Sequence, residues 1–122
     1  MANESYVDVM QDTFAQMPGF VGSAVADSDS GMALATLGGG DGLNIELAAA
    51  ANTDVVKAKR KAIAMLELNE GIEDILITLD SQYHLIRPVE SSPEVFVYLA
   101  VDRKTANLAV ARMTLRKVTS RF

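Results

Sequence analysis

The sequence predicts an α+β domain with the element order helix, strand, strand, long helix, strand, strand, strand, helix. Residues 72–101 contain two runs rich in β-branched and aromatic residues, with a mixed run between them and Asp-Ser and Ser-Ser-Pro turns as separators. This composition is typical of a three-strand antiparallel meander. Residues 43–69 contain many of the best helix formers. With 122 residues and no internal repeat or linker, the chain is expected to form one domain over residues 1–122.

The N-terminal part is predicted to form a helix and a hairpin. Residues 5–17 place apolar side chains at helical spacing before Pro18-Gly19, which indicates an amphipathic helix that ends there. Residues 20–26 and 32–37 are predicted strands, joined by the sequence Asp-Ser-Asp-Ser-Gly at residues 27–31. The carboxylates of this turn could suggest calcium. The long loop and distant bidentate Glu of an EF-hand are missing, so a plain hairpin turn is favoured.

The next segment is predicted to be a flexible connector followed by a long helix. Glycine-rich residues 38–42 lack the Lys-Ser/Thr of a phosphate-binding loop. A helix over residues 43–69, with Gly71 as its stop, would be about 40 Å long, more than one small sheet needs. One broad stripe along it is formed by Ala48, Asn52, Val55, Val56, Lys59, Ala62, Ile63 and Leu66. Because small residues let helices approach closely, the helix could serve both its own sheet and a second subunit. The alternative is a helix that covers its own sheet and nothing else.

The last predicted strand, residues 95–101, is apolar on both faces. Side chains alternate along a strand, so Val95, Val97, Leu99 and Val101 point one way and Phe96, Tyr98 and Ala100 the other. Such a strand needs cover on both sides. Residues 108–122 form a second amphipathic pattern with a basic last turn. We expect the first and last helices to share one face of the sheet and the long helix to cover the other.

Composition excludes several classes of chemistry. The chain has no cysteine, so disulfides, thiolate catalysis and cysteine-based metal centres are impossible. The formal net charge is -5, and no Lys or Arg precedes Lys57. This asymmetry is compatible with complementary association, whereas a net acidic surface makes nucleic acid an unattractive partner. The start lacks a basic segment followed by an apolar run, and no stretch is long enough for a membrane span. We therefore expect a cytoplasmic protein without direct membrane insertion.

No catalytic constellation is visible. For His84, the one histidine, a strand surface or interface position is favoured over a general base. The pair Glu73-Asp74 could do acid–base work, but strand neighbours point to opposite faces, which favours a solvated strand start. Arg87, Arg103 and Arg112 could be arginine fingers, although surface ion pairs are the simpler explanation. We therefore assign no catalytic, metal-binding or cofactor-binding residue.

The basic cluster KAKRK at residues 57–61 has three possible roles. A solvated helix face is the simplest, and a surface for a protein partner comes next. Membrane headgroups or nucleic acid come last, because no aromatic residues interleave the charges and the chain is net acidic.

The chain resembles the roadblock/dynein light chain family, whose bacterial members include regulators of Ras-like GTPases. The resemblance covers residues 6–118 and is carried by the element order, the Asp-Ser-Asp-Ser-Gly hairpin and the alanine-rich helix. Above all it is carried by ILITLDSQYHLIRPV and the following VFVYLAVDRKTANLAVARMTLRKV. It implies a five-stranded antiparallel sheet with the long helix on one face and the two terminal helices on the other. The glycine-rich residues 38–42 look like a local elaboration of the family pattern.

The resemblance also implies a homodimer and a partner. Family members pair the strand equivalent to residues 72–79 with its copy and pack the two long helices together. The residues of this chain expected at that interface are Ala48, Val55, Lys59, Ile63, Ile75, Leu76, Ile77 and Leu79. An apolar strand of this kind would be hazardous as an exposed edge. A Ras-like GTPase is expected to lie across the exposed side of the long helix, at Asn52, Val56, Lys57, Arg60 and Lys61.

These observations lead to three hypotheses. The first is a non-enzymatic homodimeric adaptor, without a cofactor, that binds and regulates a small Ras-like GTPase. The second is a structural scaffold subunit of a larger complex without nucleotide dependence. The third is a small-molecule sensor, which would need a pocket in the sheet.

Overall fold

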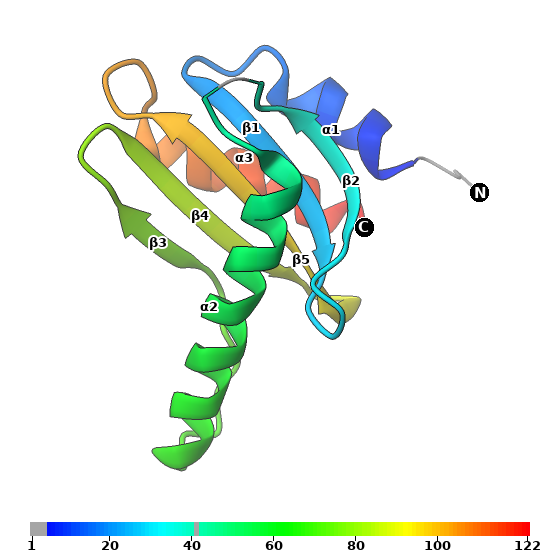
Figure 1. Ribbon diagram of the computed structural model, residues 1–122, viewed down its shortest axis with the longest axis vertical. Helices are drawn as coiled ribbons and strands as arrows, with labels where there is room; N and C mark the ends of the chain where they lie inside the picture. The colour runs from blue at the N-terminus through cyan, green and yellow to red at the C-terminus, as the bar shows by residue number, and fades with distance from the viewer. Residues whose placement is uncertain (1–4, 41) are drawn as a thin grey trace.

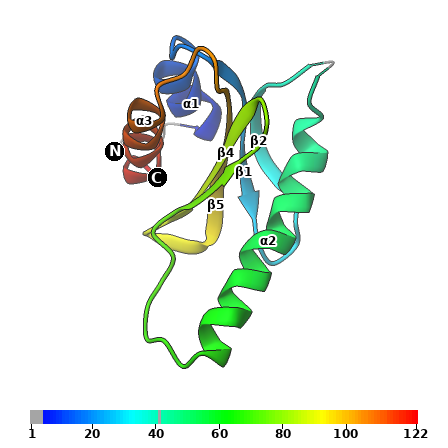
Figure 2. The ribbon, with the colours of Figure 1, turned by 90° about the vertical axis from the view of Figure 1, so that its left-hand side faces the viewer.

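The computed structural model describes residues 5–40 and 42–122, and it contains three layers (Figures 1 and 2). A five-stranded antiparallel sheet with strand order β2-β1-β5-β4-β3 separates the long helix α2 from the terminal helices α1 and α3. The elements are α1 (Tyr6–Phe14), β1 (Phe20–Asp27), β2 (Ala33–Gly38), α2 (Ile45–Met65), β3 (Ile75–Thr78), β4 (Gln82–Val89), β5 (Ser92–Asp102) and α3 (Leu108–Ser120). The predicted fold class and element order are confirmed.

The central strand β5 lies between two hydrophobic clusters. Val95, Val97, Leu99 and Val101 belong to the cluster under α1 and α3. The alternate residues Phe96, Tyr98 and Ala100 belong to the cluster under α2. The predicted alternation is therefore confirmed, and it explains why this strand needs helices on both faces.

Helix α2 is shorter than predicted. Asn44 precedes it and accepts a hydrogen bond from the Leu47 N–H, so the helix begins at Ile45. It ends at Met65, and Glu67 then has a φ of 55°, in the left-handed region. In this turn the N–H of Glu67 donates to the carbonyl of Ala64, and the N–H of Leu68 donates to that of Ile63. The turn that glycine usually makes is therefore made by Glu67, and the prediction of Gly71 as the stop is wrong.

Two loops need glycine for clear reasons. Gly19 has a φ of 83°, and a Cβ there would stand 2.7 Å from the backbone nitrogen of Ala106. Gly38 has a φ of 73°, and a Cβ there would stand 2.7 Å from the carbonyl oxygen of Val21. The predicted connector over residues 38–42 continues with positive φ at Gly39 and Gly40, while its Asp41 falls outside the described residues.

The hairpin turn after β1 is closed by one carboxylate. Asp27 accepts hydrogen bonds from the Asp29 N–H and the Ser30 hydroxyl, at 3.0 and 2.9 Å. Its carboxylate oxygens thus serve the turn itself. Within residues 5–40 and 42–122, no helix combines the length and apolar character needed to cross a membrane.

Candidate partner-binding surface

The two halves of α2 differ in what they contact. The buried residues of the helix are Ile45, Ala48, Ala49, Asn52, Thr53 and Val56, all within its first twelve positions. Beyond Val56 the helix continues past the end of the sheet, as Figure 1 shows. None of residues 57–84, which include the second half of α2 and all of β3, is buried.

Three residues predicted at intermolecular surfaces are instead buried inside the subunit. The exposed fraction is 8% for Ala48, 8% for Asn52 and 0% for Val56. The side-chain N–H of Asn52 also donates a hydrogen bond to the carbonyl of Ala48, at 2.8 Å. Placing Asn52 and Val56 on the exposed side of the helix, and Ala48 at a subunit interface, was therefore wrong. These side chains form the face of α2 that packs on its own sheet.

Arg60 has an intramolecular role that the sequence did not reveal. Its guanidinium donates to the Ser28 hydroxyl at 3.2 Å and to the carbonyl of Pro93 at 2.7 Å. Ser28 is itself buried and donates to the carbonyl of Glu94. Arg60 therefore ties the second half of α2 to the turn after β1 and to the start of β5.

The lysines of the basic cluster remain available. Lys57, Lys59 and Lys61 are exposed, and none of them forms an ion pair within the described part of the chain. At 100° per residue, Lys57 and Lys61 point away from the face that Val56 buries. Lys59 lies on the same flank as the half-buried Val55, one turn away.

Strand β3 forms an open edge of the sheet. Among the described residues it pairs with β4 alone, and it contains no charged residue. Leu76 and the following Leu79 are 36% and 42% exposed, whereas Ile75 and Ile77 are partly buried. Four of the residues predicted at a dimer interface therefore lie in or next to an uncharged edge, which is the kind of edge that proteins normally cover.

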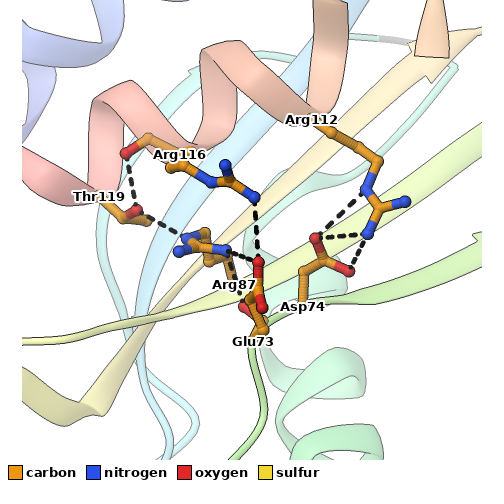
Figure 3. A network of polar contacts seen from close by, with 6 residues as sticks. All are labelled: Glu73, Asp74, Arg87, Arg112, Arg116 and Thr119. Carbon is orange, nitrogen blue, oxygen red and sulfur yellow. Dashed lines mark hydrogen bonds and ion pairs between the residues drawn. The ribbon is translucent and has the colours of Figure 1, made fainter. Parts of the chain in front are cut away.

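The segment before β3 is held by ion pairs rather than by strand pairing (Figure 3). Asp74, whose side chain is 12% exposed, accepts two hydrogen bonds from Arg112 Nη2, at 2.9 and 3.0 Å. Glu73 binds Arg116 at 3.0 Å. Both carboxylates thus point toward α3. The interpretation of the pair as solvated is wrong for Asp74, whereas the Glu73 side chain is 69% exposed. The strand begins at Ile75 instead of residue 72.

The three candidate arginine fingers are engaged within the subunit. Arg112 holds Asp74, while Arg87 donates to the Thr119 hydroxyl and to the carbonyl of Glu73, both at 3.1 Å. Arg103 donates to the carbonyl of Leu79 at 2.7 Å and lies over the Tyr83 ring. The simpler explanation, a surface ion pair, fits Arg87 and Arg112, whereas Arg103 contacts backbone carbonyls and a ring instead.

His84 lies half-buried on the α2 face of β4. Its ring contacts the Gln82 side-chain oxygen at 2.8 Å and the Tyr98 hydroxyl at 3.2 Å. Burial lowers the pKa of the imidazole below its ordinary value of 6.5, and burial raises the pKa of Tyr98 to about 12. An amide and a neutral phenol do not activate a base, so the contacts of His84 are those of a structural side chain.

Comparison with family models and with curated proteins found no match. Solved structures do match. A Roadblock/LC7 domain from Streptomyces avermitilis superposes with a TM-score of 0.77 at 15% identity, covering 92% of this chain and 89% of that one. The chain has the roadblock fold. Myxococcus xanthus MglB matches with a TM-score of 0.73 at 14% identity, covering 92% of this chain and 83% of that chain. An MglB structure with a tetrameric arrangement matches with a TM-score of 0.76 at 14% identity, covering 93% and 82%. The roadblock fold thus accounts for nearly the whole chain.

Proposed function

We propose that the chain is a non-enzymatic, homodimeric, cytoplasmic adaptor of roadblock type that binds a small Ras-like GTPase and regulates it. The observation that carries this proposal is the stretch of residues 57–84, where a helix end and an edge strand contain no buried residue. The fold shared with MglB and the sequence resemblance to regulators of Ras-like GTPases support the class of partner.

The dimer is supported by apolar side chains that one subunit leaves uncovered. Those assigned to the dimer are Met65, Leu66, Leu76 and Leu79, between 36% and 74% exposed. Pairing β3 with its copy would satisfy the open backbone groups of the edge. The same association brings the second halves of two α2 helices together and covers Met65 and Leu66.

The GTPase surface is supported by the outward lysines of α2. Within the described part of the chain, Lys57 and Lys61 form no ion pair, whereas the Arg60 guanidinium is hydrogen-bonded to Ser28 and Pro93. The protein would act by binding one switch conformation of the GTPase more tightly than the other, because a ligand shifts an equilibrium only by its differential affinity. The GTPase would supply the catalytic site.

The proposal is tested by titrating the small Ras-like GTPases of the same organism, each loaded with GDP or with a GTP analogue. The double variant Lys57→Glu/Lys61→Glu should weaken the complex about tenfold or more. The matched control is Lys104→Glu/Lys117→Glu, which changes the net charge equally at exposed sites elsewhere. Absence of binding to either nucleotide state at micromolar concentration would refute the proposal.

The dimer is tested separately by sedimentation equilibrium. Leu76→Lys should give a monomer, because a lysine on the edge opposes strand pairing. Val110→Lys, at a residue of α3 with similar exposure (39%), should leave the dimer intact. A wild-type monomer at high concentration would rule out the homodimer.

A structural scaffold is the second candidate, favoured by the tetrameric arrangement of a matching MglB structure. It predicts equal binding of the partner in both nucleotide states. The titration described above therefore separates the two candidates.

A further inference from the structure

An open groove of about 700 Å³ lies between the second half of α2, residues 66–74 and the turn between β4 and β5. Its apolar lining includes Ile63, Ala64, Leu68, Ile72, Val89 and Pro93. Of these, Leu68 is 48% exposed, and Ile63 and Ile72 are partly buried. The groove therefore offers apolar surface to a ligand without any rearrangement of the core.

The walls of the groove are fixed in place. Arg60 joins α2 to Pro93 across the groove, and the Leu68 N–H donates to the carbonyl of Ile63. The ion pairs of Figure 3 hold the far end of residues 66–74 against α3. The opposite wall is attached to the C-terminus, since the Ser91 hydroxyl donates to the carbonyl of Phe122. A groove with fixed walls can bind a ligand without a large cost of ordering the protein.

The charge of the rim favours a cationic ligand. Glu70 on one wall and Glu90 on the other are exposed, and neither has an ion-pair partner within the described residues. The last turn of α2, which borders the groove, contains no basic residue to offset the negative end of the helix dipole. The two lining guanidinium groups, of Arg60 and Arg87, are turned to oxygens of the protein itself.

We propose that this groove is a docking site for a basic amphipathic segment of a partner protein. An apolar side chain of the segment would insert between Leu68, Ile72 and Val89, and Lys or Arg residues on either side would reach Glu70 and Glu90. Carboxylates at the rim repel phosphate, so nucleic acid and anionic lipid are the wrong chemistry. Lys57 and Lys61 do not line the groove, but they lie next to Ala64 on the same side of α2. This site therefore adjoins the GTPase surface without including its two lysines. The adaptor would then hold two partners, one at a basic and one at an acidic surface.

The test uses the full chain and a fluorescein-labelled amphipathic peptide of leucine and lysine, with the same peptide in leucine and glutamate as the ligand control. The lysine peptide should bind with micromolar affinity, and the glutamate peptide should not bind. Amide and methyl NMR shifts should change at Ile63, Leu68, Ile72 and Val89 and little elsewhere. Leu68→Ser should weaken binding about tenfold or more, which corresponds to ~1.4 kcal/mol. The exposed Leu47, which does not line the groove, supplies the control Leu47→Ser, expected to change affinity less than twofold.

A charge-matched pair of variants separates docking from general attraction between opposite charges. Glu70→Lys/Glu90→Lys should abolish peptide binding, while Asp8→Lys/Asp29→Lys, with the same charge change at exposed sites elsewhere, should not. Equal weakening by both pairs, or shifts spread over the whole surface, would overturn the proposal. It would also be overturned if the groove variants left peptide binding unchanged but altered the oligomeric state, since a second copy of the chain would then occupy the groove.

Discussion

Two regions of the molecule are stabilised by different means. The apolar region consists of β1, β2, β5 and residues 45–56 of α2, and its side chains Ala24, Val25, Ala26 and Val56 are fully buried. The clamped region consists of residues 57–65 of α2, residues 66–74 and β3, and none of its residues is buried. Hydrogen bonds and ion pairs of Arg60, Arg87, Arg112 and Arg116 hold it in place.

The difference shows how a small domain keeps apolar side chains available for other molecules. Apolar burial stabilises the first region, so its apolar side chains are already covered within the subunit. In the second region polar contacts at the periphery fix the backbone, which leaves Met65, Leu66 and Leu76 exposed. Residues of the first region should therefore affect folding, and those of the second should affect association.

The largest effect on the free energy of unfolding is expected when apolar residues at the two ends of α2 are compared. Ile45 is 4% exposed and Met65 is 74% exposed. Ile45→Ala should lower the free energy of unfolding by about 2–5 kcal/mol, because it leaves a cavity between helix and sheet. Met65→Ala should change it by less than about 0.5 kcal/mol. Urea denaturation at low protein concentration measures both.

Repeating these measurements at several protein concentrations tests whether a second copy contributes. If the loss caused by Met65→Ala grows with protein concentration, a second copy covers the end of α2. A loss as large as that of Ile45→Ala at every concentration would show that the two regions do not differ.

The next effect concerns the ion pair that holds the segment before β3. Asp74→Ala should lower the free energy of unfolding by about 1.5–3 kcal/mol, since a nearly buried carboxylate loses two charge-assisted hydrogen bonds to Arg112. Glu73, with 69% of its side chain exposed, is the matched control, and Glu73→Ala should cost about 0–1 kcal/mol. Equal losses measured by denaturation would contradict the assignment of Asp74 as the main clamp.

A smaller effect is expected at Arg60, which joins the two regions. Arg60→Ala removes hydrogen bonds to Ser28 and Pro93 and should lower the free energy of unfolding by about 1 kcal/mol. Lys61→Ala, at the next and exposed position, should have no measurable effect on stability. Hydrogen exchange should show faster opening of residues 57–65 in Arg60→Ala alone. Unchanged hydrogen exchange of residues 57–65 would show that Arg60 does not hold the clamped region in place.

The apolar region was more predictable from the sequence than the clamped region. The alternation of β5 depends on neighbouring residues along one strand, so Val95 and Phe96 could be assigned to opposite faces in advance. The contacts of Asp74 and Arg112 join positions far apart in the chain, and nothing local indicates them. The end of α2 was also hidden, because Leu66, Glu67 and Leu68 are good helix formers and only the turn at Glu67 ends the helix.

The surface of α2 was only partly predictable for a physical reason. Its many alanines make the apolar stripe broad, so spacing alone did not separate the buried Asn52 and Val56 from the outward Lys57. Arg60 was assigned by charge type to the same surface as the lysines. A guanidinium can reach two distant backbone segments, and the sequence does not show which partners it finds.

The smallest expected effect lies at the boundary of the two regions, where His84 of β4 pairs with Ile77 of β3. Burial lowers the pKa of His84 below 6.5, so the unfolded chain binds more protons than the folded chain between the two pKa values. Stability should therefore be complete above about pH 7 and fall as the pH drops from 6.5 through the lowered pKa. His84→Gln should remove this part of the pH dependence, measured by urea denaturation between about pH 8 and pH 5. Because His84 is the one histidine, no other imidazole contributes in that range.

Identical profiles for the wild type and His84→Gln would show that His84 is as well solvated in the folded state as in the unfolded one. A steeper fall at higher protein concentration would instead place His84 under a second copy of the chain, on the side of the molecule that one subunit leaves open.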